Sequence, residues 1–173
     1  MILCLFAGFI YFYYNEDSFS FSKLLPLPFT LGLLFFFSLI FKAFEFIFLK
    51  NESGLNVDLP QNFAAWLFCI LGFIFSAFYE EVLYRFYLCE SLLKFVETKA
   101  SEKTLNFKRN IGLFFEIVIA LLFAFSHLYL GWLSVVNAFA AHIILRITYK
   151  KSGAIWAGFI AHFIYNIISL ILL

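Results

Sequence analysis

A chain of 173 residues with 64% hydrophobic and 13% charged residues is not an ordinary soluble domain, because such domains are roughly 45–50% apolar and about 25% charged. A soluble fold of this length has too little interior to bury that much apolar surface, whereas lipid can cover it. The net charge of +1 argues against nucleic acid as a partner. The composition therefore predicts an integral membrane protein, and the fold class that we expect is an all-α, polytopic transmembrane helix bundle.

The apolar runs predict about six helices, because a helix needs about 20 apolar residues to cross a bilayer. In chain order they cover residues 1–14, 24–49, 62–95, 111–127, 134–149 and 154–173. The first run begins at the initiator methionine and lacks the basic region and cleavage site of a signal peptide, so we expect a short or truncated helix. Loops or turns are expected at residues 15–23, 50–61, 94–110, 128–133 and 150–153. We interpret 1–173 as one membrane domain, with N-terminal helices in 1–61 and a core in 62–173.

The basic residues predict the orientation of these helices, since short cytoplasmic loops carry an excess of Lys and Arg. The 94–110 stretch contains Lys94, Lys99, Lys103, Lys108 and Arg109. Arg146, Lys150 and Lys151 follow two crossings later, so the two groups fall on the same side. We expect that side to be cytoplasmic and the C-terminus to be external. Trp66 and Trp132 then lie near the outer interface and Trp156 near the inner one.

Ionisable residues inside membrane helices are costly and usually functional. The third apolar run contains Glu80, Glu81 and Arg85. Glu81 and Arg85 are four residues apart and share a helix face, while Glu80 points about 100° away and is free to face a different neighbour. Two adjacent carboxylates beside one arginine cannot all be stable as charges in a dry interior. This arrangement favours one carboxylate as a general base.

Two further runs supply the other candidate groups. The fourth ends in His127, and the last contains His162 and Asn166, which are four residues apart and share a face. Glu, His, His and Asn are thus offered by three helices, which is how sites in the interior of a bundle are built. Counted from the basic boundary, Glu80, His127 and His162 lie at heights of roughly 21, 27 and 16 Å. The active site is therefore expected inside the bundle.

Three motifs in order carry a resemblance to a known family. Glu-Glu-x-x-x-Arg is met by Glu80, Glu81 and Arg85, Phe-x-x-x-His by Phe123 and His127, and His-x-x-x-Asn by His162 and Asn166. This pattern resembles the CPBP family of intramembrane proteases, the CAAX prenyl endopeptidases and Abi-like bacteriocin-processing enzymes, over about residues 63–168. The approach to the last motif, residues 149–156, is similar to bacterial members, which implies a bacterial inner membrane.

The resemblance implies a role for each motif residue. Glu80 and His127 would hold and activate the attacking water, and His162 and Asn166 would stabilise the oxyanion of the tetrahedral intermediate. Glu81 with Arg85 would shape the site. Acid–base chemistry allows the first pair of roles, and imidazole and amide N–H donors allow the second. The expected function is an intramembrane endopeptidase that cuts a membrane-associated peptide or protein, with lipid as its other partner.

Alternatives to this function remain open. A zinc-dependent version of the hydrolase would use Glu80, His127 and His162 as ligands, with Glu81 also available. The absence of His-Glu-x-x-His and His-x-x-Glu-His favours the form without a metal or other cofactor. A proton-coupled transporter could use the buried carboxylates as relays, although no inverted repeat is present. A third alternative is a non-catalytic immunity or scaffold protein, which would have the same fold without the activity.

Other polar residues in the apolar runs are interpreted as structural. Lys42 and Glu45 are expected to neutralise each other, His142 to serve in helix packing, and Asn137 to form a hydrogen bond between helices. Glu116 is expected either to pair with Arg85 or to face water. The three cysteines show no paired spacing and are expected to be free: Cys4, Cys69 and Cys89.

Overall fold

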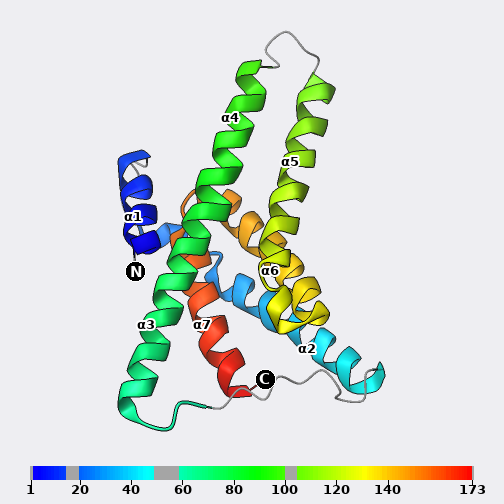
Figure 1. Cartoon of the computed structure of the whole chain (residues 1–173). Coiled ribbons are helices and arrows are strands. Elements are labelled where there is room, and N and C mark those ends of the chain that lie inside the picture. The colour runs from blue at the N-terminus through cyan, green and yellow to red at the C-terminus, as the bar shows by residue number, and fades with distance from the viewer. Residues whose placement is uncertain (1, 15–19, 49–58, 100–104, 173) are drawn as a thin grey trace.

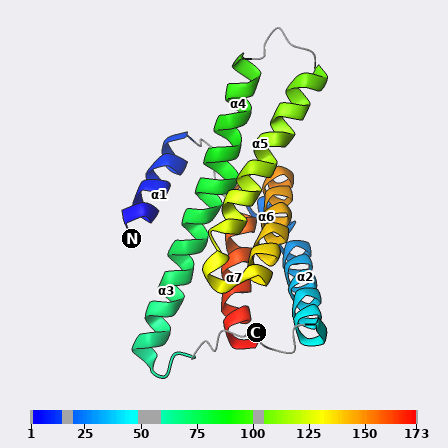
Figure 2. The same cartoon turned by 45° about the vertical axis from the view of Figure 1, so that its right-hand side comes forward.

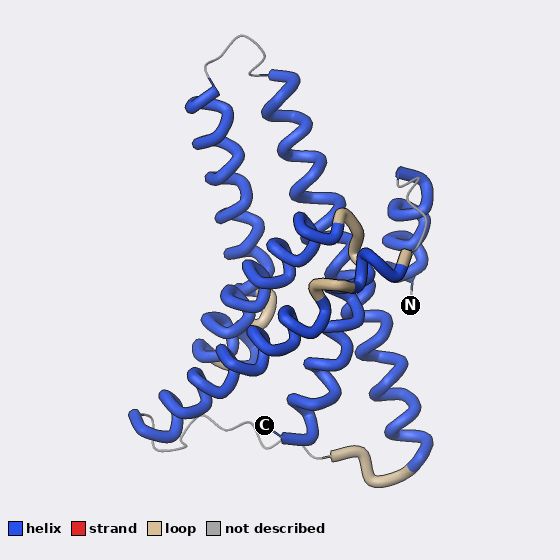
Figure 3. Tube along the Cα trace, turned by 180° about the vertical axis from the view of Figure 1, so that it is seen from behind, coloured by secondary structure: helices blue, strands red, loops and turns tan. Residues whose placement is uncertain are grey.

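The computed structural model describes residues 2–14, 20–48, 59–99 and 105–172, which form helices joined by short turns (Figure 3). No strand occurs among these residues. The elements are α1 (Ile2–Tyr14), η1 (Phe21–Leu24), α2 (Leu27–Phe48), α3 (Phe63–Glu80), η2 (Glu81–Leu88), α4 (Cys89–Lys99), α5 (Leu105–Phe125), η3 (Leu128–Leu130), α6 (Trp132–Ser152) and α7 (Trp156–Leu172). Because α3, η2 and α4 form one continuous rod, the described residues contain six main helical rods, as predicted for an all-α bundle.

The rod made by α3, η2 and α4 is the longest element of the molecule (Figure 1). It begins at Phe63, because the Asn62 side chain accepts a hydrogen bond from the Ala65 amide at 2.8 Å, as N-cap residues do. Its Phe63–Thr98 portion has 36 residues, whereas about 20 suffice to cross a bilayer. The rod is therefore longer than a single perpendicular crossing requires.

The predicted loop at 94–110 is wrong at both ends. Helix α4 continues to Lys99 and α5 already begins at Leu105, which leaves only 100–104 outside the described residues. Figures 1 and 2 show α4 and α5 side by side, extending together beyond the rest of the bundle. Glu, Lys and Leu are good helix formers, so a polar composition did not end either helix.

Smaller differences occur at other helix ends. Helix α5 ends at Phe125, so His127 lies in the turn after the helix and not within it. Helix α6 spans Trp132–Ser152, longer at both ends than predicted, and stops where Gly153 adopts φ 67°, a left-handed conformation that glycine accepts readily. The predicted loops at 15–23 and 50–61 lie largely outside the described residues.

The surface of the molecule has the character of a membrane protein. It measures 11245 Å², against about 8,700 Å² for a compact soluble protein of this mass. Large apolar side chains cover much of it, with Phe63 84% and Phe68 74% exposed. Among the described residues, three segments are long and apolar enough to cross a membrane, namely Phe21–Phe48, Phe63–Thr98 and Trp132–Ser152. Ile2–Tyr13 and Trp156–Leu172 are shorter apolar helices.

Helix α7 lies within the bundle and packs on α2, α3 and α6. Small residues make this packing close, since Ala157 and Ala161 are fully buried. One apolar cluster joins Ala161 to Leu34, Ile144 and Leu145 of the neighbouring helices. Because α7 approaches α3 so closely, side chains near the end of α3 can reach α7 directly.

Candidate active site

The first motif lies where the long rod changes its helical form. Residues Glu81–Leu88 form a π-helix, with α-helix before and after. Two carbonyls here accept hydrogen bonds from side chains of the same rod. That of Glu80, just before the π-helix, accepts from Arg85 Nη1 at 3.4 Å, and that of Tyr84 accepts from Cys89 Sγ at 3.1 Å. Helical segments of this kind are rare and are frequent at functional sites. Nothing in the residue pattern of the third apolar run predicted it.

The imidazole of His162 lies between both glutamates. Its Nδ1 is 3.0 Å from Glu81 Oε1, and its Nε2 is 3.8 Å from Glu80 Oε2. Ser76 Oγ donates a hydrogen bond of 2.6 Å to the other oxygen of Glu80. Glu80 thus has a neighbour of its own in Ser76, as its position on the helix allows, and the two carboxylates also approach one imidazole from the sides of its two nitrogens.

Glu81 and Arg85 form the buried support of this arrangement. Both are fully buried, and Arg85 Nε lies 3.5 Å from Glu81 Oε1, so the predicted shared face is present. The Arg85 guanidinium lies over the ring of Phe123, with its Cζ 4.1 Å from the centroid, which is a favourable cation–π distance. Glu81 also lies close against α7 at Gly158. A Cβ added to this glycine would lie only 2.7 Å from Glu81 Oε2.

Phe123 is the packing centre of the site. Its buried ring lies 4.8 Å from that of His127, 5.4 Å from that of His142 and 6.4 Å from that of His162. The motif Phe-x-x-x-His therefore marks a ring that organises three imidazoles, a role that the sequence alone did not indicate. His142 is buried in helix packing, as predicted.

His127 is oriented by the end of α5. Its Nδ1 lies 2.9 Å from the carbonyl oxygen of Phe123 and 3.2 Å from Ser126 Oγ. A carbonyl oxygen can only accept, so the Nδ1–H tautomer satisfies this contact and leaves the Nε2 lone pair for another partner.

One cavity of about 480 Å³ brings the four candidate residues together. Glu80, His127, His162 and Asn166 all line it, while Glu81 and Arg85 lie behind its wall. Apolar side chains supply much of the rest of the lining: Leu34, Phe73, Phe123, Leu145 and Leu170. The heights predicted for Glu80 and His127 were counted from Lys94 and Arg109. Both of these residues lie inside helices and do not mark a common boundary, so the predicted difference in height does not apply to the fold.

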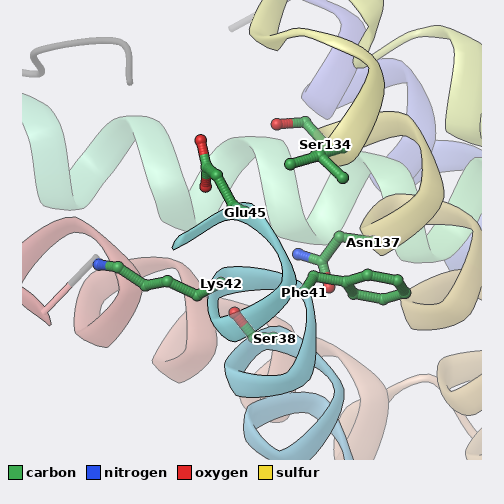
Figure 4. Close-up of a pocket in the computed structure, with 7 residues that line it drawn as sticks. Ser38, Phe41, Lys42, Glu45, Ser134 and Asn137 are labelled. Atoms are coloured by element: carbon green, nitrogen blue, oxygen red, sulfur yellow. The ribbon is translucent and has the colours of Figure 1, made fainter. Parts of the chain in front are cut away.

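A smaller cavity of about 170 Å³ adjoins the large one between α2 and α6 (Figure 4). Ser134 and Asn137 line both cavities. Asn137 Nδ2 donates a hydrogen bond of 2.9 Å to Tyr165 Oη, so the predicted bond between helices is confirmed. Lys42 also lines the smaller cavity, and its Nζ lies 3.3 Å from the carbonyl oxygen of Leu172.

Glu116 has partners that the sequence did not suggest. It accepts from Arg146 at 3.0 Å and lies 2.7 Å from Lys150 Nζ, both on α6. The alternative of pairing with Arg85 is wrong, because α5 packs along α6 at this level, and the Glu116 side chain stays 20% exposed. Spacing along one helix could not reveal a partner on another.

No three His, Cys, Asp or Glu side chains in the described parts of the chain are grouped so that they could hold a metal ion. His162 Nδ1 is engaged by Glu81, and its Nε2 is the nitrogen that lies toward Glu80. The described cysteines Cys4, Cys69 and Cys89 are free, as predicted.

The fold and the cavity define a membrane-embedded protein with a polar site inside a helix bundle. Residues 62–168 match the family model described as type II CAAX prenyl endopeptidase Rce1-like. The chain belongs to this family, in agreement with the motif resemblance, and it is an integral membrane protein of a protease family. Comparison with curated proteins and with solved structures gave no match.

Proposed function

We propose that this protein is an intramembrane endopeptidase in which Glu80 and His127 activate a water molecule for attack on a peptide bond. The observation that carries the proposal is the single cavity lined by Glu80, His127, His162 and Asn166. A carboxylate and an imidazole at one cavity can polarise one water. Ser76 holds one oxygen of Glu80 and leaves Oε2 for the proton that the water gives up.

The oxyanion would be held by His162 and Asn166. With Nδ1–H donating to the Glu81 carboxylate, His162 carries a second proton on Nε2 only as the imidazolium. Two carboxylates flank this ring and Arg85 supplies one positive charge, so an imidazolium would bring the group of four to neutrality. The Nε2–H and the Asn166 amide can then donate to the oxygen that becomes negative.

The reaction proceeds without a covalent intermediate between enzyme and substrate. The oxygen of water forms a bond to the carbonyl carbon, and its proton passes to Glu80 Oε2 with His127 orienting the water. The tetrahedral intermediate then expels the amine, and Glu80 returns the proton to the leaving nitrogen. The products are a carboxylic acid and an amine, and Glu80 is again a carboxylate.

The apolar lining of the cavity supports a membrane-associated peptide or protein as substrate, with apolar groups beside the cleaved bond. The similarity of residues 149–156 to bacterial members supports a location in a bacterial inner membrane. We propose the form without metal, because the known zinc-protease motifs are absent from the sequence.

The deciding experiment is Glu80→Gln in protein reconstituted into lipid vesicles. The probe is a quenched fluorescent peptide that ends in a prenylated CAAX sequence, as the family description suggests. Glutamine keeps the volume of Glu80 and cannot take a proton, so cleavage should fall by about 10²–10⁴ while the folded protein remains in the membrane. Wild-type activity in the variant would refute the base role.

Metal dependence is tested with a chelator on the same vesicles. We expect wild-type cleavage to persist after zinc has been removed and its absence verified by elemental analysis. Activity that disappears on chelation and returns with zinc would replace this mechanism by one in which Glu80, His127 and His162 are metal ligands.

A further inference from the structure

Arg146 lies on α6, outside the three motifs, and is nearly fully buried at 4% exposure. Its guanidinium joins two other rods. Nη2 and Nε lie 3.0 and 3.3 Å from Glu116 Oε1 on α5, and Nη1 lies 3.0 Å from Glu90 Oε1 on α4. A buried arginine with this many partners fixes the relative positions of the helices that supply them.

The contact with the π-helix distinguishes Arg146 from an ordinary ion-pair residue. Nη1 also donates a hydrogen bond of 2.8 Å to the backbone carbonyl of Arg85, and this bond is buried. In an α-helix the amide of Cys89 would donate to that carbonyl. Here the Cys89 amide donates to the carbonyl of Phe86, so the side chain from α6 engages Arg85 at the point where the helical form changes.

We propose that Arg146 is a positioning residue that holds the π-helical segment in the form that presents Glu80 and Glu81 to His162. Arg85 pairs with the Glu81 carboxylate and also donates to the backbone carbonyl of Glu80 at 3.4 Å. Fixing the Arg85 backbone therefore constrains the Glu81 side chain and the backbone that carries Glu80. This inference rests on the proposed function, because it concerns how the same site is aligned. Arg146 itself does not line the large cavity.

Lys150 provides a matched control on the same helix. Its Nζ lies 2.7 Å from the same oxygen of Glu116, but its side chain is 51% exposed, and within the described residues this ion pair joins it to α5 alone. Arg146 and Lys150 thus share one carboxylate, and only Arg146 connects it to the backbone of η2. Replacing either residue by methionine removes one positive charge that pairs with Glu116.

The experiment compares Arg146→Met with Lys150→Met in vesicles, with kcat and KM for the quenched prenylated peptide referred to the amount of folded protein. We expect Arg146→Met to lower kcat at least tenfold with KM within about twofold, because displacement of reacting groups by about 1 Å can cost up to 10²-fold in rate. Lys150→Met should keep kcat within about twofold of the wild type. Equal kcat values for the two variants would overturn the proposal.

Arg146→Lys supplies the same test if Arg146→Met does not fold. The three donors of an ammonium sit on one atom, so it cannot replace the separate nitrogens by which Arg146 binds Glu116 on one side and Glu90 and the Arg85 carbonyl on the other. We therefore expect a several-fold lower kcat and a pH profile displaced from that of the wild type. A wild-type kcat and pH profile in the folded Arg146→Lys protein would also overturn the proposal. These outcomes are separate from failure of the proposed function, which is full activity in Glu80→Gln.

Discussion

Two groups of charged side chains lie in the described bundle, and they differ in how completely they are paired. The first, the cavity cluster, comprises Glu80, Glu81, Arg85 and His162. The second, the ion-pair cluster, comprises Glu90, Glu116, Arg146 and Lys150. In the ion-pair cluster the two cations meet the two carboxylates at 2.7–3.0 Å. In the cavity cluster Glu80 Oε2, Glu81 Oε2 and Arg85 Nη2 are buried without a hydrogen-bond partner among the described residues.

This difference separates groups that hold the fold from groups available for a reaction. A buried polar atom without a partner costs about 1–3 kcal/mol, and a catalytic role or a bound water or ion is among the explanations for such an atom. The cavity cluster carries this cost beside a cavity of about 480 Å³. The ion-pair cluster avoids it and joins α4, α5 and α6. We therefore expect changes in the first cluster to lower activity and changes in the second to lower stability, except at Arg146, which also binds the Arg85 carbonyl and so affects both.

The largest effect on the cavity side beyond Glu80 is expected for Asn166→Ala. Loss of an oxyanion donor removes stabilisation where negative charge develops, so kcat should fall by about 10²–10³. KM should change little, because the ground-state carbonyl binds this donor weakly. The measurement is steady-state cleavage in vesicles. A rise in KM with unchanged kcat would instead assign Asn166 to substrate binding.

Gly158→Ala tests the contact between the rod and α7. The added Cβ would lie 2.7 Å from Glu81 Oε2 and 3.5 Å from its Cδ. Glu81 is fully buried against Arg85 and His162 and has little room to move, so its bond to His162 should break. We expect kcat to fall about 10²-fold, as for other displacements of about 1 Å in an active site.

Gly72→Ala is the control for that variant. It lies on α3, and a Cβ there would meet nothing within 4 Å. Alanine is the better helix former by about 1 kcal/mol, so Gly72→Ala should keep full activity and gain slightly in thermal stability. Equal activity of the two glycine variants would show that the closeness of Gly158 to Glu81 has no part in catalysis.

Ser76→Ala is expected to have a smaller effect on activity. The Ser76 hydroxyl donates to Glu80 Oε1 at 2.6 Å, one helical turn before the glutamate. Its loss leaves the carboxylate in the cavity and frees its orientation. Because this bond is exposed, it contributes no more than the lower end, about 1.5 kcal/mol, of the range for hydrogen bonds to charged groups. We expect kcat to fall roughly threefold to tenfold, and Ser76→Thr, which keeps the hydroxyl, to restore most of it.

The sequence predicted the parts of this site that depend on spacing within one helix. Glu81 and Arg85 share a face because they are four residues apart, and the helices carrying His162 and Glu80 were recognised from their apolar runs. It did not predict the π-helix, because the same residues fit an α-helix equally well and contacts such as Arg146 to the Arg85 carbonyl come from another rod. Spacing fixes the face that a side chain occupies, and packing between rods fixes its partner.

The ends of the helices show a second limit of the sequence. Polar residues at 94–110 predict a loop, yet α4 and α5 continue through most of that stretch. The criterion for a bilayer crossing marks where apolar residues stop, while a helix ends only where its backbone loses its hydrogen-bond partners. The same holds for His127. The apolar run continues up to this residue, yet the helix ends at Phe125 and His127 lies in the turn that follows.

The smallest effect on activity is expected for Glu116→Gln, which tests the other side of the comparison. The amide oxygen of glutamine can still accept from Arg146, and Arg146 keeps its bonds to Glu90 and the Arg85 carbonyl. Both cations lose a negative partner, and hydrogen bonds to charged groups contribute about 1.5–3 kcal/mol each. We therefore expect the Tm in detergent to fall by several degrees, while kcat per folded molecule stays within about twofold of the wild type. A tenfold loss of kcat at unchanged Tm would place Glu116 with the reacting groups and remove the distinction between the two clusters.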